Sequence, residues 1–403
     1  MKKKDFIVIL CLIILLALCF LLSGTKTDGA YVEIRVDNEV FGVYPLNVDK
    51  DIHVKNNTVE IKNSLVSMTS ADCPDKLCVK SKPISKCGET ICCLPCKITL
   101  SIIDELNKQT VTALKLGTIV TITIEDNSDP ELLQDCLDIC DRFDSVCSCT
   151  NTSSELYLLN HRLINSDDNT YSVSNELYNL LSEGVRYSKQ SDGRFNIGIG
   201  AITSLWNFSG NSDAAIPNQN TLSKNVTLSG YENIELLGNN TIRLKNDTVQ
   251  IDLGALAKGY IADYIRAYLI DHGVTRATIS LGGDTTTIGS DFTIGIQKPF
   301  SPEGTLITTV EVSDESVVTS GTYERCFEKD GKLYHHIIDP STGYPYESDL
   351  TSVSVILPSA TDGDFYATYL FSLGEKDAYK YACENNIKAI FVTKDGSVIS
   401  TID

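Results

Sequence analysis

The feature that most constrains this chain is an uninterrupted apolar run over residues 6–22, which follows Lys2, Lys3, Lys4 and Asp5. These 17 residues would span about 26 Å as a helix, close to the thickness of about 30 Å of a bilayer's hydrocarbon core. Lysines beside such a run are expected to stay in the cytoplasm. Residues 1–28 are therefore predicted to form an N-terminal membrane anchor or signal segment, with the rest of the chain extracytoplasmic.

The residues at the end of the apolar run are compatible with three alternatives for this segment: a cleaved signal peptide, a lipoprotein signal or an uncleaved anchor. A cleavable signal peptide needs small residues there, and Ser23 and Gly24 provide only a weak version. Residues 16–19 resemble a lipoprotein box, with the bulky Leu18 where a small residue is usual. A single uncleaved anchor in the cell membrane is the favoured interpretation, and all three alternatives place the body of the chain outside the membrane.

The 14 cysteines have to be interpreted in this exported setting. Six lie between Cys73 and Cys96, and four lie between Cys136 and Cys149. Export permits disulfides, whereas an anaerobic habitat would permit free thiols. Zinc would favour Cys93-x-x-Cys96 together with two further cysteines. Because pairing cannot be deduced from spacing, disulfides, a metal site and free thiols all stay open for residues 73–96.

The acidic balance of the chain argues against nucleic acid as a partner. There are 53 acidic and 34 basic residues, for a formal net charge of −19, and no basic run beyond the three N-terminal lysines. A strongly acidic surface repels a phosphate backbone. Neither DNA nor RNA binding is expected.

Residues 29–104 are predicted to form a small cysteine-rich β domain. Val32, Ile34 and Val36 alternate with polar neighbours, which is the period of a half-buried strand. Further short strands are expected at residues 41–46, 58–61, 65–68 and 98–102, separated by turn residues. Residues 105–115 are interpreted as a connector.

From residue 118 onward the pattern becomes mixed. Strands are expected at residues 118–124, 277–281 and 351–357. Helices are expected after Asp129-Pro130, after Ser174, and over residues 255–272 and 362–373. The Asn-rich stretch 207–246 is predicted to form irregular surface loops. The fold class is therefore α+β: a mixed α/β domain over residues 105–403, preceded by the small all-β domain and an N-terminal membrane helix.

Residues 252–263 form the first motif with chemical content. Asp252 is expected to end an apolar strand over residues 249–251, Gly254 to allow a tight turn, and a helix to begin near Ala255. The free N–H groups and dipole of a helix N-terminus favour an anion. Lys258 in the first turn can reach a phosphate as a point charge. The alternative is an ordinary strand, turn and helix with a solvated lysine.

The second motif combines a histidine pair with a carboxylate and a hydroxyl. His335 and His336 on a strand point to opposite faces, so at most one faces a site, and His335 is expected to face away. Residues 339–343 have the composition of a β-turn. Asp364 and Thr368 share one helix face and offer the hard oxygen atoms that Mg²⁺ accepts. The alternative is a set of locally satisfied hydrogen-bonding groups.

Three smaller pieces complete the set. Residues 282–284 (Gly-Gly-Asp) follow a strand, and residues 319–321 (Thr-Ser-Gly) supply hydroxyl and N–H groups at another strand end. Residues 193–200 and the single tryptophan, Trp206, are interpreted as a ring-binding loop, although a lone Trp is more often part of a core.

Together these residues resemble the ApbE family of FAD:protein FMN transferases. The similarity extends over residues 114–402, and its weight comes from the order and spacing of many pieces. They are residues 116–118, 153–160, 193–208, 252–263, 280–284, 319–327, 335–345 and 364–374.

The resemblance implies a substrate, a metal and a reaction. FAD would bind with Mg²⁺ on its pyrophosphate, and FMN would pass to a Ser or Thr hydroxyl of a membrane redox protein, releasing AMP. By position, the main chain of Ala255 and the side chains of Asp364 and Thr368 look like the Mg²⁺ ligands. His336 falls at a histidine associated with catalysis. The implied FAD contacts are Leu116, Thr150, Arg194, Phe195, Asn196, Asp252, Lys258 and Ile338.

The chain departs from the family pattern at five positions, four of which are among the residues just named. Leu116 replaces a usual Met, Thr150 a usual aromatic residue and Asn196 a usual Asp. Ala255 stands where some members carry Thr, and Ala367 where some carry a further Asp. The resulting metal site offers fewer side-chain ligands, so more of the Mg²⁺ ligands would be water molecules and FAD phosphate oxygens.

The N-terminal domain resembles the NusG domain II-like module that precedes ApbE domains in some bacteria. The residues that support this resemblance are 43–46, 73–78 and 91–95.

Two other functions stay open for the whole chain. One is an FAD pyrophosphatase that yields FMN and AMP, with water in place of the hydroxyl. The other is a flavin-binding protein without chemistry.

Overall fold

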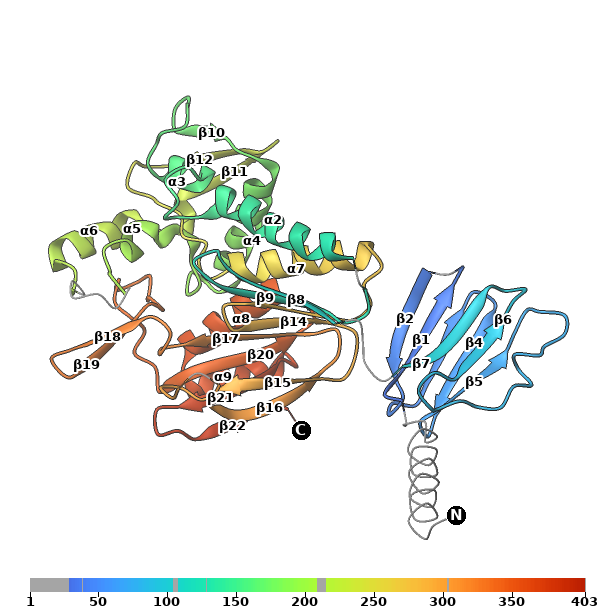
Figure 1. Ribbon diagram of the computed structural model, residues 1–403. Coiled ribbons are helices and arrows are strands. Elements are labelled where there is room, and N and C mark those ends of the chain that lie inside the picture. Colours follow the sequence, from blue (N-terminus) through green and yellow to red (C-terminus); the bar gives the residue numbers. More distant parts are fainter. Residues whose placement is uncertain are drawn as a thin grey trace, which may run out of the picture. The chain divides into compact units, whose positions relative to one another are not determined.

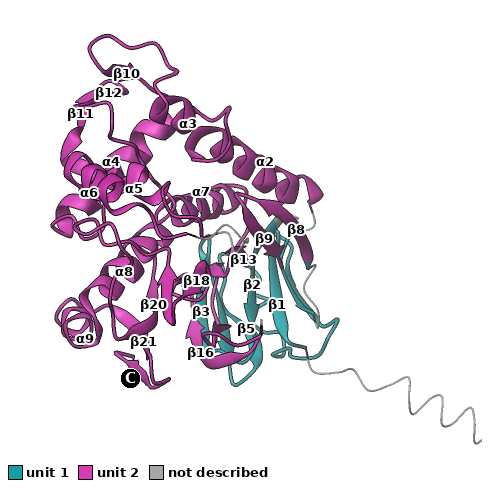
Figure 2. Cartoon of the chain, turned by 90° about the vertical axis from the view of Figure 1, so that its left-hand side faces the viewer, with its two compact units in different colours: residues 1–108, 125–128 teal, residues 109–124, 129–403 magenta. Residues whose placement is uncertain are grey.

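The computed structural model describes residues 29–37, 39–103, 108–127, 129–208, 215–302 and 304–402 (Figure 1). The predicted anchor and all three fates proposed for it fall on residues 1–28, outside the described residues. Among the described helices, none has the length and apolar character needed to cross a membrane. The chain divides into two compact units, one of residues 1–108 and 125–128 and one of residues 109–124 and 129–403 (Figure 2).

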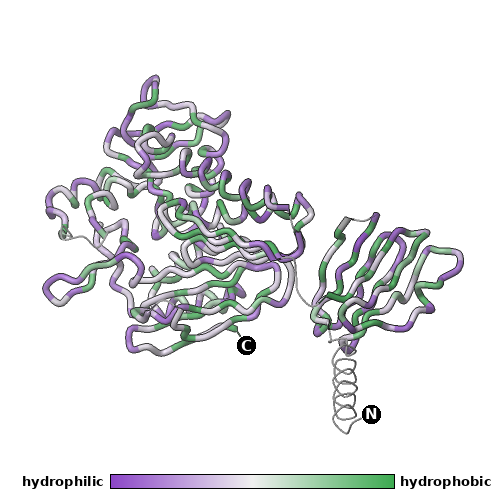
Figure 3. Tube along the Cα trace, in the orientation of Figure 1, coloured by the Kyte–Doolittle hydropathy of each residue, from purple (hydrophilic) through white to green (hydrophobic). Residues whose placement is uncertain are grey.

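The first unit contains two antiparallel sheets around one apolar core. One sheet has the order β2 (Glu39–Pro45), β1 (Tyr31–Val36), β7 (Ile98–Ile103) and β6 (Thr90–Cys93). The other has the order β3 (Lys50–Val54), β4 (Asn57–Lys62) and β5 (Leu65–Ser70). Hydrophobic and hydrophilic residues alternate along these strands (Figure 3), which buries one face of each sheet. The predicted all-β character is confirmed, and β3 and β6 are strands that the sequence analysis missed.

The second unit is built on one eight-stranded antiparallel sheet, in agreement with the predicted α+β class. Its order is β22 (Val398–Ser400), β21 (Lys388–Thr393), β20 (Leu350–Leu357), β17 (Ser316–Gly321), β14 (Asp284–Ile288), β13 (Ala277–Leu281), β9 (Thr118–Ile124) and β8 (Gln109–Lys115). Smaller sheets pair β15 (Phe292–Gln297) with β16 (Leu306–Val312), β18 (Cys326–Lys329) with β19 (Lys332–His335), and β12 (Thr241–Leu244) with both β10 (Thr170–Ser172) and β11 (Ile234–Gly238).

The helices begin where the sequence places side-chain caps. Asp129 caps α2 (Pro130–Cys147), Ser174 caps α4 (Asn175–Gln190) and Ser359 caps α8 (Ala360–Leu373), each by accepting a hydrogen bond from a backbone N–H in the first turn. The other described α-helices are α3 (Glu155–Asn160), α5 (Gly200–Thr203), α6 (Gln219–Leu228), α7 (Ala257–Asp271) and α9 (Glu375–Glu384).

Three sequence-based expectations for this unit are wrong. The connector 105–115 is largely strand β8, whose Thr and Val residues alternate at the edge of the large sheet. The stretch 207–246 contains α6, β11 and β12, because a capping Asn218 and paired strands override its Asn-rich composition. Residues 249–251 form no strand, since Asn160 pairs with both backbone groups of Ile251 at 2.8 Å in place of a neighbouring strand.

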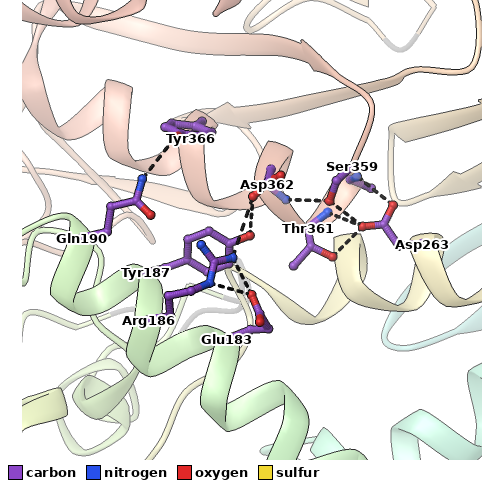
Figure 4. A network of polar contacts seen from close by, with 10 residues as sticks. Glu183, Arg186, Tyr187, Gln190, Asp263, Ser359, Thr361, Asp362 and Tyr366 are labelled. Atoms are coloured by element: carbon purple, nitrogen blue, oxygen red, sulfur yellow. Dashed lines mark hydrogen bonds and ion pairs between the residues drawn. The ribbon is translucent and has the colours of Figure 1, made fainter. Parts of the chain in front are cut away.

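Helices α7 and α8 lie side by side and pack on β13, β14, β17 and β20. Gly259 makes this close approach possible, because a Cβ at this position would lie 2.2 Å from the carbonyl oxygen of Ala360. Asp263, one turn further along α7, accepts hydrogen bonds from the N–H groups of Ala360 and Thr361, both at 2.9 Å (Figure 4). It also accepts from the hydroxyl groups of Ser359 and Thr361 at 2.8 and 2.6 Å. The N-terminus of α8 is therefore held against the first two turns of α7.

A substitution at the crossing tests this packing. Gly259→Ala should lower the free energy of unfolding by about 2–3 kcal/mol, because α7 and α8 must separate to make room for one methyl group. The measurement is chemical denaturation of the full chain. Asp271→Ala, at an exposed position in the last turn of α7, is the control and should change stability by about 0.5 kcal/mol or less. Equal stability of the two variants would contradict the proposed role of Gly259.

Candidate active site

A buried ion pair lies at the centre of the candidate site. Lys258, in the first turn of α7, bonds through Nζ to Oδ2 of Asp284, whose side chain is largely buried. The other oxygen of Asp284 accepts the N–H of Thr319 at 2.9 Å. Burial alone would lower the pKa of Lys258, but the charges of Asp284, Asp364 and Glu324 outweigh it and raise that pKa above its ordinary value. Lys258 therefore stays a cation.

A tight hairpin presents Asp284 to Lys258. Strands β13 and β14 are joined by Gly282 and Gly283, and Leu281 pairs directly with Asp284. Both glycines have positive φ, +65° and +100°, a backbone conformation that glycine adopts at little cost and that two-residue hairpin turns require. The Gly-Gly-Asp sequence thus fixes the position of the carboxylate.

Asp364 caps the start of α7. Its Oδ2 accepts the N–H of Gly259 at 2.7 Å, one of the N–H groups in the first turn of a helix that have no partner within the helix. The Ala255 carbonyl and Oδ1 of Asp364 accept no hydrogen bond from any residue that the structure describes. Burial raises the pKa of Asp364 to about 7, against the opposing charge of Lys258.

Thr368 lies one turn after Asp364 on α8. Its hydroxyl is 3.1 Å from that of Ser320, near the end of β17. The two oxygen atoms left open on Ala255 and Asp364, with the Thr368 hydroxyl, form the kind of oxygen donor set that Mg²⁺ accepts while it keeps several waters. These residues therefore fit the metal that the family resemblance implies. The helical spacing of Asp364 and Thr368 was visible in sequence, whereas the open Ala255 carbonyl is a property of the fold.

His336 has a free acceptor nitrogen. Its Nδ1 lies 3.3 Å from the carbonyl oxygen of Arg325, and because a carbonyl only accepts, Nδ1 carries the proton and Nε2 keeps its lone pair. Burial and the nearby charges of Arg325 and Lys258 lower the pKa of His336 to about 4. The ring is therefore neutral near pH 7, as a general base must be.

His335 faces the other way, as strand alternation predicts. Its Nε2 donates to the carbonyl of Tyr346 at 3.1 Å, and its ring packs edge-on against Phe371. Its Nδ1 is buried with no partner among the described residues. His335 is therefore part of the core, whereas His336 is only partly buried.

The residues that the resemblance implies as FAD contacts fall into two groups. Some lie near the surface or in an apolar cluster, and the others form hydrogen bonds or ring contacts within the site. Leu116 has φ +54° at the turn between β8 and β9, Thr150 is exposed between α2 and α3, and the guanidinium of Arg194 donates to the carbonyl of Ser372 at 3.1 Å. These three are accessible or near the surface. Ile338 is buried in a satellite cluster with Trp206, which makes Trp206 a core residue.

The other residues implied as FAD contacts form hydrogen bonds or ring contacts that stabilise the turns around the site. Asp252 accepts from the Thr203 hydroxyl at 2.6 Å and from the N–H of Gly254 at 2.8 Å. Asn196 accepts two backbone N–H groups, both at 2.9 Å, and Phe195 packs edge-on against Phe365. These side chains shape the turns of the site, and their contact with FAD stays a prediction.

Sequence reasoning missed how several residues would be used. Asp284, Asp263 and Ser320 all lie in or beside the motifs described above, yet spacing alone could not pair Asp284 with Lys258 or Asp263 with the start of α8. A carboxylate directly after Gly-Gly at a strand end was the available signal for Asp284. Arg325, beside His336, had no signal in the sequence.

Comparison with known proteins decides the family. The sequence profile of the ApbE family matches residues 116–391, more than half of the chain. The chain belongs to the ApbE family. The profile of NusG domain II matches residues 6–105, in agreement with the resemblance inferred for the N-terminal domain.

Individual relatives agree with this assignment. An FAD:protein FMN transferase of Klebsiella pneumoniae (strain 342) is 38% identical over 263 residues, which cover 64% of this chain and 81% of that protein. The FAD:protein FMN transferase of Treponema pallidum is 36% identical over 246 residues, covering 56% of this chain and 68% of that protein. The crystal structure of the ApbE protein from Thermotoga maritima matches with a TM-score of 0.66 and 29% identity, covering 73% and 97% of the two chains.

A double-mutant cycle tests the central ion pair. Lys258→Met should lower the free energy of unfolding by about 2–3 kcal/mol, because it leaves buried carboxylates without a counter-charge. The double variant Lys258→Met/Asp284→Asn should cost at least about 1 kcal/mol less than the sum of the single variants.

The control for this cycle is an exposed ion pair of the same type. Lys332 bonds to Glu347 at 2.6 Å, with side chains 55% and 82% exposed, so Lys332→Met should cost about 1 kcal/mol or less. If Lys258→Met costs no more than this control, the pair does not organise the site.

Proposed function

We propose that this ApbE-family chain transfers FMN from FAD to a Ser or Thr hydroxyl of a membrane redox protein and releases AMP, in a Mg²⁺-dependent reaction. Family membership supports the transferase activity. The observation that carries the mechanism is the pair of oxygen atoms, the Ala255 carbonyl and Oδ1 of Asp364, that accept no hydrogen bond from a described residue, with the charge of Lys258 acting on Asp364. A neutral histidine with a free nitrogen completes the same region.

The reaction requires a nucleophile, a leaving group and a place for one proton. The acceptor hydroxyl oxygen forms a bond to the phosphorus of the FMN half, the bond from that phosphorus to the bridging oxygen breaks, and AMP leaves with that oxygen. Nε2 of His336 is the candidate base for the hydroxyl proton. The positive charge of Lys258 at the N-terminus of α7 favours the anionic pyrophosphate.

Mg²⁺ would be held by Asp364, Thr368 and the main chain of Ala255, and when bound it would neutralise charge on the phosphates. Leu116, Thr150, Arg194, Phe195, Asn196, Asp252, Lys258 and Ile338 are proposed to contact FAD. The apolar run over residues 6–22 supports a single N-terminal membrane anchor with the catalytic domain on the extracytoplasmic side, where it would meet a membrane-bound acceptor.

A transfer assay separates this function from its alternatives. The full chain is incubated with FAD, MgCl₂ and an acceptor domain that carries a Ser/Thr flavinylation motif, and the products are resolved by mass spectrometry. Covalent FMN on the acceptor together with AMP is the expected result. Free FMN and AMP without labelled acceptor would replace the proposal by FAD pyrophosphatase activity, and binding of FAD with neither product would replace it by a flavin-binding role.

Two variants test the assigned residues in this assay. Asp364→Ala should abolish transfer through loss of the metal, and His336→Ala should slow transfer by about 10²–10⁴-fold while the dissociation constant for FAD stays unchanged. His272→Ala, an exposed histidine at the end of α7, is the control and should transfer at the normal rate. Normal flavinylation by Asp364→Ala or His336→Ala would refute the corresponding assignment.

The lowered pKa of His336 predicts the acid limb of the reaction. The measurement is made at saturating Mg²⁺, where the cation keeps Asp364 ionised. The rate of FMN transfer should stay constant below pH 6.5 and fall only as the pH approaches about 4, the pKa of His336. Arg325→Gln removes a positive charge that disfavours the imidazolium, so it should raise that pKa and move the limb to higher pH. If Arg325→Gln does not shift the pH at which the transfer rate falls, protonation of His336 is not the cause of that fall.

A further inference from the structure

Four cysteines of the N-terminal unit converge from two separate segments. Cys73 and Cys78 follow β5, Cys93 ends β6, and Cys96 lies in the turn between β6 and β7. The sulfur atoms of Cys73, Cys78 and Cys93 all lie within 4.8 Å of one another, and each of these side chains is at most 5% exposed. Cys96, three residues after Cys93, is partly buried and lies outside this set of three. Three sulfur ligands are thus gathered in one buried place, with a fourth cysteine close by in the chain.

The spacing of the sulfurs suits a shared cation. The Cys73 and Cys78 sulfurs are 3.6 Å apart. In a tetrahedral zinc site with Zn–S bonds of about 2.3 Å, neighbouring sulfurs are about 3.8 Å apart. A disulfide would bring the two sulfur atoms to about 2.05 Å.

The two segments present their sulfurs in a similar way. The backbone N–H groups of Lys76 and Cys96 lie near the sulfurs of Cys73 and Cys93, each three residues along the chain. Lys76 and Lys97 both adopt a left-handed backbone conformation, with φ of +49° and +54°. Tight turns whose N–H groups point at cysteine sulfurs stabilise negative charge on those sulfurs.

We propose that Cys73, Cys78, Cys93 and Cys96 form a tetrathiolate site for one structural Zn²⁺ ion. Binding releases four thiol protons to solvent and leaves a site of net charge −2. Cys92 is excluded, because it precedes Cys93 on β6 and its side chain is exposed on the other face of the strand. The inference is independent of the flavin chemistry.

The bound ion would connect the two sheets of the unit. Cys73 and Cys78 extend from the three-stranded sheet, whereas Cys93 and Cys96 belong to the β6–β7 hairpin of the four-stranded sheet. Domains of fewer than about 80 residues often rely on such a metal, because their apolar cores are small. Zinc here would add to the stability that the two sheets obtain from their shared apolar core.

Metal analysis of the full chain tests the site. Protein purified anaerobically without chelator, from cells grown with zinc, should contain about one Zn²⁺ per chain by elemental mass spectrometry. Replacement by Co²⁺ should give the intense charge-transfer bands of cobalt bound to four thiolates, a readout that requires no variant.

Matched variants assign the metal to these residues. Cys93→Ser should lose most of the zinc and the cobalt bands, whereas Cys92→Ser, its neighbour on the same strand, should keep both. Asp364→Ala, in the other unit, should also keep the zinc. Because Cys93→Ser can fail to fold, the cobalt spectrum of the unsubstituted chain is decisive on its own.

Three results would overturn the proposal. The first is a chain without metal whose mass shows two disulfides among these four cysteines. The second is a chain without metal in which all four thiols react freely. The third is zinc retained in full by the double variant Cys93→Ser/Cys96→Ser. One iron per chain, with loss in Cys93→Ser, would support the tetrathiolate site and replace zinc as its occupant.

Discussion

The candidate active site depends on one hydrogen bond between two helices. The N–H of Gly259, in the first turn of α7, bonds to the carboxylate of Asp364 on α8. This bond places a carboxylate at the N-terminus of α7, where the N–H groups of the first turn have no partner within the helix. It also requires that residue 259 have no side chain, since α8 passes where a Cβ would lie. The close packing of α7 and α8 at Gly259 therefore also fixes the position of the Asp364 carboxylate.

Charge in this region is arranged so that each group keeps the state it needs. Lys258 stays protonated because acidic groups surround it, and His336 stays neutral because burial and nearby cations disfavour its charged form. Burial shifts Asp364 toward its protonated form, which a bound cation would reverse. The region is therefore electrostatically incomplete without a divalent cation, in agreement with the donor set that it offers.

Periodicity and caps were sufficient to predict part of the framework, including α2, α4, α8, β9, β13 and β20. The failures have physical causes. The edge strand β8 pairs on one side only and none of its residues is fully buried, so its apolar signal is weak. Helix α6 depends on a cap at Asn218 inside an Asn-rich stretch. The motifs of the site were visible, but which carboxylate meets Lys258 depends on long-range pairing that spacing does not contain. Three thiols that meet across two sheets are likewise invisible to a count of cysteines.

The two-residue hairpin before Asp284 has a consequence for how this family can vary. Because side chains alternate along a strand, inserting or deleting one residue between β13 and β14 would turn Asp284 to the opposite face of the sheet. A surface loop far from the site can change length without moving the chemistry. This turn cannot, and both of its glycines have positive φ, so relatives that retain the activity are expected to keep both the length of this turn and its glycines.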